Sequence, residues 1–383
     1  MPLPFRIDVP QAKLDAILAR VRDYSWDALP DAGGWAHGTS IPFMRDLCRH
    51  WLDRYDWRAA EADLNRLPQF KADADGLALH FVHVKGVGPS PKPLVITHGW
   101  PGSFFEFAGV VGPLADPARF GGDPADAFDV VVPSMPGYGF SDRPSAPIGP
   151  RSVARHIDAL MKDVLGYHRY IAQGGDWGGA ISGWLGHDHP ACGAVHLNMV
   201  TGTSQSMKPE TEAEKAWAAQ LSKVLDEEGG YRMLQATRPQ TLAFAMHDSP
   251  VGVAAWIVEK FAAWSDLPRG ADGAPDLLAR YSMDALLTNI MIYLVTDSFA
   301  TAAWLYRGRQ IEQPLRFPGR VSKPTGVAAF PDPCFKPPPR SFVEKGFDVI
   351  HWTDMARGGH FAALEEPELF VGDVRAFGRK LEW

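Results

Sequence analysis

The stretch Tyr170-Ile-Ala-Gln-Gly-Gly-Asp-Trp-Gly178 joins an apolar run to a helical pattern through a glycine-rich turn. Residues 170–172 are typical of a strand, and residues 180–186 are typical of the helix that follows it. The turn fits the pattern G-x-nucleophile-x-G of a sharp strand-to-helix elbow, in which the glycines let the backbone turn tightly. Asp176 stands at the nucleophile position. In the alternative interpretation, Asp176 only caps the helix.

Strand-like apolar runs recur on both sides of this turn. They lie at residues 77–85, 93–97 and 128–132 before it, and at residues 325–330 and 347–351 after it. A short continuous run such as residues 93–97 suits a strand that is buried on both faces of a parallel sheet. Because the strands alternate with helical patterns, the sequence predicts an α/β fold with a mostly parallel central sheet.

Changes of pattern divide the chain into four segments. Residues 1–75 combine helical periodicity with several tryptophans, so we expect an N-terminal extension that packs on the core and the cap. Residues 76–200 and 315–383 are the two parts of the α/β core. Residues 201–314 are helical almost throughout, which predicts a helical cap inserted between the sixth and seventh strands.

The composition is that of a globular protein. Of the 383 residues, 46% are hydrophobic, and the net charge of −7 includes no basic block for nucleic acid or anionic lipid. No signal peptide and no apolar run of ~18 residues are evident. The three cysteines lie far apart, and no metal-ligand spacing is visible. We therefore expect a cytoplasmic protein with no metal, no cofactor, and no nucleic-acid or membrane partner.

An aspartate at the elbow supports different chemistry from the serine that esterases carry there. A carboxylate with a reference pKa of ~3.9 is ionised at neutral pH and needs no base before it attacks. Attack at a saturated carbon leaves an alkyl ester on the enzyme. Hydrolysis of that ester requires a base that activates water and an oxyanion hole for the carbonyl oxygen.

The loop Thr97-His-Gly-Trp-Pro-Gly102 follows an early strand, where folds of this type provide the second oxyanion donor. The backbone N–H groups of Trp100 and Trp177 are therefore the candidate donors. A simple turn at the end of the strand is the alternative interpretation of this loop.

His360 is the candidate base. It lies in Arg357-Gly-Gly-His-Phe361, after the last strand signal, as the chain order of nucleophile, acid and histidine requires. His187 and His189 lie on or beyond the helix that follows the elbow, and His351 ends a strand, so their positions disfavour them. An ordinary surface loop is the alternative interpretation of His360.

Asp332 is the candidate acid. It follows the strand that ends at residue 330, and no other carboxylate occurs before Glu344. Asp332 would orient the imidazole of His360 and stabilise its protonated form. A turn-forming aspartate between two prolines is the alternative interpretation, and Asp354 is the fallback acid.

Long strings of this chain resemble the bacterial epoxide hydrolases of the microsomal type, which have the α/β-hydrolase fold and an N-terminal extension. The matching strings include Tyr55-Asp-Trp-Arg58, His98-Gly-Trp-Pro-Gly-Ser103, Pro133-Ser-Met-Pro-Gly-Tyr-Gly-Phe-Ser141, Gly174-Gly-Asp-Trp-Gly178, Thr237-Arg-Pro-Gln-Thr241 and Gly358-Gly-His-Phe-Ala-Ala-Leu-Glu-Glu-Pro367. The resemblance covers nearly the whole chain. It implies that water opens a small apolar epoxide to a vicinal diol without a cofactor; a homodimer is a possible assembly.

The resemblance also implies two cap tyrosines that donate hydrogen bonds to the epoxide oxygen. Tyr231 and Tyr306 stand at the matching places. A tyrosine in a helical cap is otherwise more often part of the core, and Tyr281 and Tyr293 are the competing candidates.

The acid departs from the family pattern. The family usually carries it two residues after a Phe-Pro pair, a slot that Pro333 occupies here, one residue after Asp332. Two alternative functions remain. A haloalkane dehalogenase shares the aspartate nucleophile and a following tryptophan that can hold halide. A catalytically inactive hydrolase-fold binding protein is favoured by the displaced acid alone.

Overall fold

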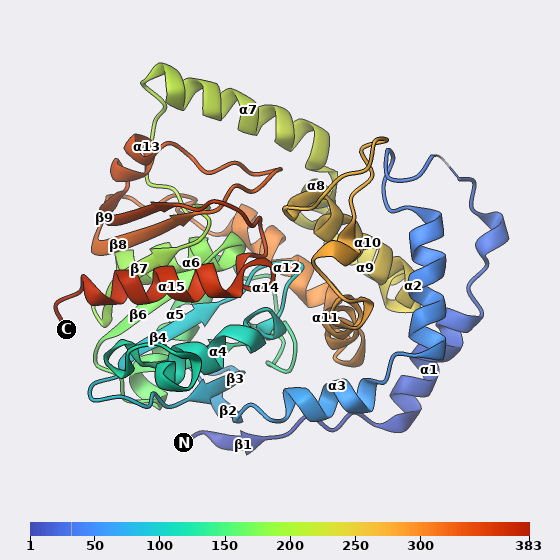
Figure 1. The fold of residues 1–383 in the computed structure, drawn as a ribbon, viewed down its shortest axis with the longest axis horizontal. Helices are drawn as coiled ribbons and strands as arrows, with labels where there is room; N and C mark the ends of the chain where they lie inside the picture. Colours follow the sequence, from blue (N-terminus) through green and yellow to red (C-terminus); the bar gives the residue numbers. More distant parts are fainter. Residues whose placement is uncertain (32) are drawn as a thin grey trace.

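A nine-stranded mixed sheet runs through the computed structural model, which describes residues 1–31 and 33–383 (Figure 1). Its strands are β1 (Leu3–Phe5), β2 (Gln69–Asp73), β3 (Ala78–Val84), β4 (Lys92–Thr97), β5 (Phe128–Pro133), β6 (Tyr170–Gly174), β7 (Cys192–Leu197), β8 (Val321–Ala329) and β9 (Phe347–Asp354). Their order in the sheet is β1-β2-β3-β5-β4-β6-β7-β8-β9. The strand pairs β5–β4, β4–β6, β6–β7, β7–β8 and β8–β9 are parallel. The pairs β1–β2, β2–β3 and β3–β5 are antiparallel. The predicted mostly parallel α/β sheet is confirmed.

Helices cover both faces of the sheet (Figure 1). On one face α4 (Ala108–Ala115) packs against α15 (Pro367–Arg379), and on the other α5 (Pro150–Ala159) packs against α6 (Asp176–Asp188). Strands β5 and β7 are consequently buried at every position. This double coverage explains their continuous apolar sequences.

The cap consists of six helices between β7 and β8. They are α7 (Glu212–Glu228), α8 (Gly230–Thr237), α9 (Pro239–Asp248), α10 (Pro250–Trp264), α11 (Met283–Val295) and α12 (Phe299–Ile311). The insertion therefore follows the seventh strand of the sheet, not the sixth, which corrects the sequence prediction. The strands β1, β2 and β7 were not identified from the sequence. The glycine and small side chains of β7 give a weak strand signal, and β1 has three residues.

The N-terminal residues contribute to both the sheet and the cap surface. Strands β1 and β2 extend the sheet beyond β3, whereas α1 (Gln11–Arg22), α2 (Ile41–Asp53) and α3 (Trp57–Leu64) contact α11, and α1 also contacts α10. The Tyr55 hydroxyl lies 3.1 Å from the Thr288 hydroxyl of α11, and Lys13 pairs with Asp297 at 2.6 Å. The first 75 residues thus connect the edge of the sheet with the cap.

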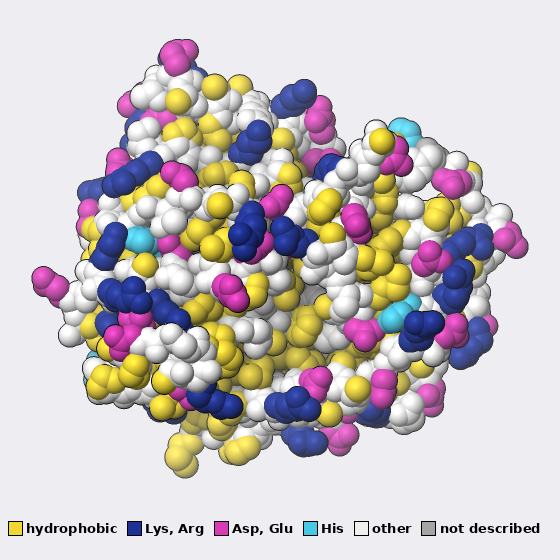
Figure 2. All heavy atoms as spheres, in the orientation of Figure 1, with side chains coloured by type: hydrophobic (Ala, Val, Ile, Leu, Met, Phe, Trp, Pro, Cys, Tyr) yellow, Lys and Arg dark blue, Asp and Glu magenta, His cyan; other side chains and the backbone are white. Residues whose placement is uncertain are grey.

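Short helices complete the described chain. They are α13 (Arg340–Glu344), α14 (Ala362–Glu365), the π-helical turn η5 (Leu160–Val164) and the 3-10 turns η1 (Trp26–Ala28), η2 (Phe104–Phe107), η3 (Pro117–Phe120), η4 (Pro124–Asp126) and η6 (Leu277–Ala279). Within the described ranges, no single helix is long and apolar enough to cross a membrane; the bent pairs α9–α10 and α11–α12 reach that threshold by length and composition when each pair is taken together. Figure 2 shows side chains of both charge signs interspersed over one face of the molecule.

Candidate active site

Asp176 lies at a tight turn between β6 and α6. Its φ of 45° falls in the left-handed region that residues other than glycine rarely adopt. A Cβ at Gly178 would lie 1.9 Å from the carbonyl oxygen of Thr97, and one at Gly174 would lie 2.2 Å from the carbonyl carbon of Gly178. Both positions therefore require glycine so that the end of the strand and the start of the helix can approach this closely. The sequence pattern and the observed elbow agree residue by residue.

The predicted oxyanion donors lie beside the Asp176 carboxylate. The backbone N–H of Trp100, in the loop after β4, donates to Oδ1 of Asp176 at 2.9 Å. Trp177 is the second residue of α6, so its N–H has no carbonyl partner within the helix. The loop approaches Asp176 so closely that a Cβ on Gly99 would lie 2.3 Å from Oδ1.

His360 lies between two carboxylates. Its Nδ1 is 3.0 Å from Oδ2 of Asp332, and its Nε2 is 3.6 Å from Oδ2 of Asp176. The other oxygen of Asp332 accepts hydrogen bonds from the backbone N–H groups of Cys334 at 2.8 Å and Phe335 at 2.7 Å. These two bonds fix the Asp332 carboxylate, which in turn orients the imidazole.

The other acids considered from the sequence lie elsewhere. Asp354 is exposed at the end of β9 and accepts a hydrogen bond from the indole of Trp352 at 2.9 Å. Glu344 is exposed and pairs with Arg340 at 2.7 Å. Of these three described carboxylates, Asp332 is the one that bonds to His360. The residue shift in the acid loop therefore does not prevent contact with the histidine.

The charge state of His360 depends on both neighbours. Burial disfavours the imidazolium, but the carboxylates of Asp176 and Asp332 outweigh this effect and raise the pKa of His360 to about 10. The two carboxylates therefore favour the protonated imidazole.

Tyr231 of α8 and Tyr306 of α12 line the same cavity as Asp176. Their ring centroids are 5.8 Å apart, and the Tyr231 ring stacks on Trp100 at 5.0 Å. The hydroxyl of Tyr306 is buried and has no hydrogen-bond partner among the described residues. Burial raises the pKa of both phenols, so both remain hydrogen-bond donors.

The competing tyrosines are engaged elsewhere in the described structure. The hydroxyl of Tyr281 lies 2.7 Å from that of Ser265, and the hydroxyl of Tyr293 donates to the carbonyl of Gly102 at 2.7 Å. Neither lines the cavity that contains Asp176.

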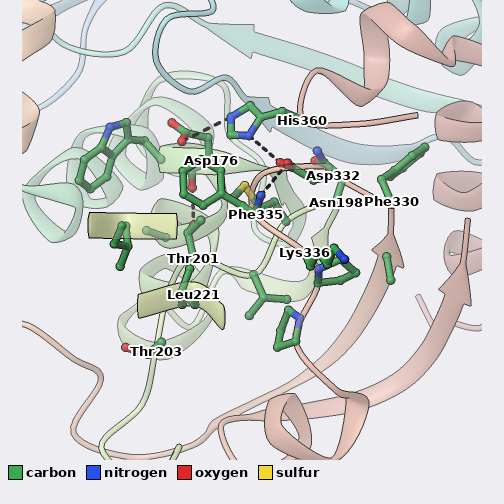
Figure 3. Close-up of a pocket in the computed structure, with 18 of the residues that line it drawn as sticks. Asp176, Asn198, Thr201, Thr203, Leu221, Phe330, Asp332, Phe335, Lys336 and His360 are labelled. Atoms are coloured by element: carbon green, nitrogen blue, oxygen red, sulfur yellow. Dashed lines mark hydrogen bonds and ion pairs between the residues drawn. The ribbon is translucent and has the colours of Figure 1, made fainter. Parts of the chain in front are cut away.

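This cavity has a volume of about 410 Å³ and lies between the cap and the carboxyl ends of the strands (Figure 3). Apolar side chains from α7 and from the loop after β8 form much of its wall; they include Trp217, Leu221, Leu225, Phe335, Pro337 and Pro338. The volume falls within the range of small-molecule sites. Across residues 1–31 and 33–383, no cluster of His, Cys, Asp and Glu side chains is suited to a metal ion.

Glu106 is a site residue that the sequence analysis missed. It lines a second cavity of about 10 Å³ together with Asp176, His360 and Trp100, near the lower limit for one water molecule. Burial, with Asp176 and Glu365 adding to it, raises the pKa of Glu106 to about 8. The feature of the sequence that could have identified Glu106 is a carboxylate within the apolar run Phe104-Phe-Glu-Phe107.

Comparisons with known proteins agree with this arrangement. The family model described as "Epoxide hydrolase N terminus" matches residues 2–107, and the model described as "alpha/beta hydrolase fold" matches residues 92–247. A Stigmatella aurantiaca protein that carries an epoxide hydrolase name is 37% identical over 99% of this chain and 85% of its own length. Epoxide hydrolase 1 of Sus scrofa is 32% identical over 99% of this chain and 89% of its own length. This chain belongs to the epoxide hydrolase family.

The solved epoxide hydrolase of Aspergillus niger superimposes with a TM-score of 0.85 at 33% identity, covering 100% of this chain and 97% of that one. Both predictions from the resemblance, the α/β-hydrolase fold and membership of the epoxide hydrolases, are confirmed. The N-terminal family segment includes α1, α2 and α3, so the helices that contact the cap are part of what this epoxide hydrolase shares with its relatives.

Proposed function

We propose that this chain hydrolyses a small apolar epoxide to a vicinal diol through a covalent ester on Asp176. One arrangement carries the proposal: the Asp176 carboxylate contacts the Trp100 N–H, lies 3.6 Å from Nε2 of His360 and lines one cavity together with Tyr231 and Tyr306. This combination provides a nucleophile, a base and two acids around one space.

In the first step, a carboxylate oxygen of Asp176 attacks an epoxide carbon, and the bond from that carbon to the ring oxygen breaks. The departing oxygen develops a negative charge that makes it a poor leaving group in an apolar cavity. Tyr231 and Tyr306 donate hydrogen bonds to it, and one of them supplies the proton. The unpartnered Tyr306 hydroxyl supports this role.

In the second step, Nε2 of His360 takes a proton from a water that attacks the ester carbonyl. The N–H groups of Trp100 and Trp177 stabilise the oxyanion. On collapse the imidazolium gives its proton to the departing diol oxygen, and the carboxyl proton of Asp176 then passes to the imidazole, which regenerates the Asp176 carboxylate. Formation of the ester removes the charge of Asp176, one of the two carboxylates that raise the pKa of His360. The imidazolium therefore releases its proton more readily, and this proton returns to the phenolate that the first step leaves. A neutral imidazole is then present when water attacks.

A single turnover in water enriched in heavy oxygen tests this mechanism. Water attacks the ester carbonyl, so the label is expected first in the Asp176 carboxylate, while the diol receives an unlabelled oxygen from the protein. Asp176→Ala should abolish diol formation and retain the fold by circular dichroism. Label that enters the diol directly in the first turnover would rule out the ester.

Haloalkane dehalogenation is the second candidate, and one observation favours it. The indole N–H of Trp177 is buried beside the nucleophile and has no partner among the described residues, as a halide-binding group would be. Release of chloride or bromide from haloalkanes, without diol from epoxides, would establish this alternative. If neither diol nor halide forms from either class of substrate, the inactive binding protein becomes the favoured interpretation.

A further inference from the structure

Besides the residues assigned to the reaction, three cationic side chains line the cavity of about 410 Å³ that contains Asp176. They are Arg232 of α8, Arg309 of α12 and Lys336 of the loop after β8; Figure 3 draws Lys336 among the lining residues. The acids that line this cavity are Asp176 and Asp332, and both lie against His360. Apart from these two carboxylates, no described acidic side chain lines the cavity with the three cationic side chains.

None of the three has an ion pair or a side-chain hydrogen bond within the part of the chain that the structure describes. The Nε of Arg232 is buried without any partner. Glu312 is near Arg309, but its carboxylate accepts hydrogen bonds from the backbone of Arg151 and Ser152 at 2.9 Å. Burial lowers the pKa of the Arg309 guanidinium despite this neighbour. An unpaired, partly desolvated guanidinium is costly, and an anion in the cavity would offset that cost.

The positions of the two arginines relate them to the proposed reaction. Arg232 directly follows Tyr231, and Arg309 lies three residues after Tyr306, on the same side of α12. A group held by Arg309 would therefore lie roughly one helical turn, ~5.4 Å, or more from the epoxide oxygen. The wall around this space is apolar and includes Leu221 and Leu225.

We infer that the cavity selects epoxides that carry a carboxylate at the end of an apolar chain, with Arg232 and Arg309 as the groups that bind it. The planar fork of a guanidinium fits a carboxylate through two hydrogen bonds. Lys336, which is exposed, attracts the anion at the mouth. This inference rests on the proposed epoxide hydrolysis and changes its substrate class from a wholly apolar epoxide to an apolar epoxide that ends in a carboxylate.

A matched pair of substrates tests the inference on the intact protein. The terminal epoxide of an octanoate chain is compared with its primary amide, which has the same length and no charge, and with styrene oxide as a neutral reference. The carboxylate should have a KM roughly tenfold below that of the amide, as expected for a charge-assisted hydrogen bond. The preference should shrink as salt is added, because salt screens the charges.

Variants assign the preference to the arginines. Arg309→Gln should abolish the carboxylate preference, whereas Arg309→Lys should retain part of it. Arg307→Gln is the matched control, because Arg307 lies on the same helix and does not line the cavity. Retention of the preference in Arg309→Gln and Arg232→Gln alike would overturn the assignment.

Different results would contradict the carboxylate preference and the proposed epoxide hydrolysis. Turnover of the amide and styrene oxide without a preference for the carboxylate would overturn the inference and leave the proposed function intact. Absence of diol from all three substrates would overturn both.

Discussion

The two oxygens of the Asp332 carboxylate have different partners, and this division predicts which half of the reaction depends on it. One oxygen is fixed by the N–H groups of Cys334 and Phe335, and the other accepts from His360 at 3.0 Å. Asp332 therefore affects the reaction through the imidazole, not through the substrate. In the proposed reaction, alkylation needs no base, whereas hydrolysis does.

Asp332→Asn is accordingly expected to keep the rate of alkylation near normal and to slow ester hydrolysis. Loss of general-base assistance typically costs ~10²–10⁴-fold, so steady-state turnover should fall within that range. Rapid-quench mass spectrometry should show accumulated alkyl-enzyme. Asp354→Asn, at an exposed acid, is the control. Wild-type turnover by Asp332→Asn would mean that the acid lies elsewhere.

His360→Gln separates the two steps more completely. The variant retains Asp176, so an epoxide should still alkylate it, but no base remains to activate water. The expected result is a stable protein adduct whose added mass equals that of the substrate. If activity disappears and no adduct forms, His360 is needed before alkylation, or it only supports the structure.

Among single residues, the sequence predicts active-site residues that stand in recognisable motifs better than those that reach the site only through tertiary packing. Asp176, Trp100 and His360 stand in short, ordered patterns, and the structure brings them together. Glu106 and Arg309 gave no such signal. Their positions depend on how η2 approaches the elbow and on which side of α12 faces the cavity, and both are consequences of tertiary packing.

Among the elements, the elbow between β6 and α6 was the most predictable because its glycines satisfy local steric requirements. The strand that follows it was missed. In β7, Cys192-Gly-Ala-Val-His-Leu197, small side chains leave little periodicity, and the strand forms because β6 and β8 pair with it on both sides. Tertiary pairing overrides weak local propensity here.

The elbow provides a prediction about folding stability. Gly178→Ala would place a methyl group against the Thr97 carbonyl, a backbone atom that cannot rotate away. We expect the free energy of unfolding to fall by roughly 1–3 kcal/mol, as for other overpacked positions. Gly372→Ala in α15 is the matched control, since a Cβ there meets nothing within 4 Å. Its stability should be unchanged or slightly higher. Equal denaturation midpoints for the two variants would contradict the steric argument.

For the molecule as a whole, buried carboxyls connect the site to the pH dependence of stability. Burial raises the pKa of Glu106 from an ordinary value of 4.5 to about 8. The protonated carboxyl therefore contributes stability that is complete below about pH 4.5 and is lost as the pH rises through about 8.

Glu106→Gln cannot ionise and should escape this loss. Its free energy of unfolding should approach the wild-type value near pH 5 and exceed it by roughly a few kcal/mol near pH 9. Urea denaturation at both pH values measures the difference. Glu382→Gln, at an exposed position, should follow the wild type. Parallel pH profiles for wild type and Glu106→Gln would show that Glu106 ionises freely.

The antiparallel pairing of β1 and β2 beside β3 affects how a truncated form of this chain would behave in solution. Strand β3 is mostly buried, and β2 covers one of its edges through five residue pairs (Figure 1). Removal of the first 75 residues would leave that edge of β3 with unpaired N–H and C=O groups next to apolar side chains. Such an edge recruits strands from other molecules. In the intact chain the outer edge belongs to β1, three residues long with a proline at position 4, which offers little to pair with. A truncated protein would therefore be expected to aggregate edge to edge even if its catalytic groups were correctly assembled.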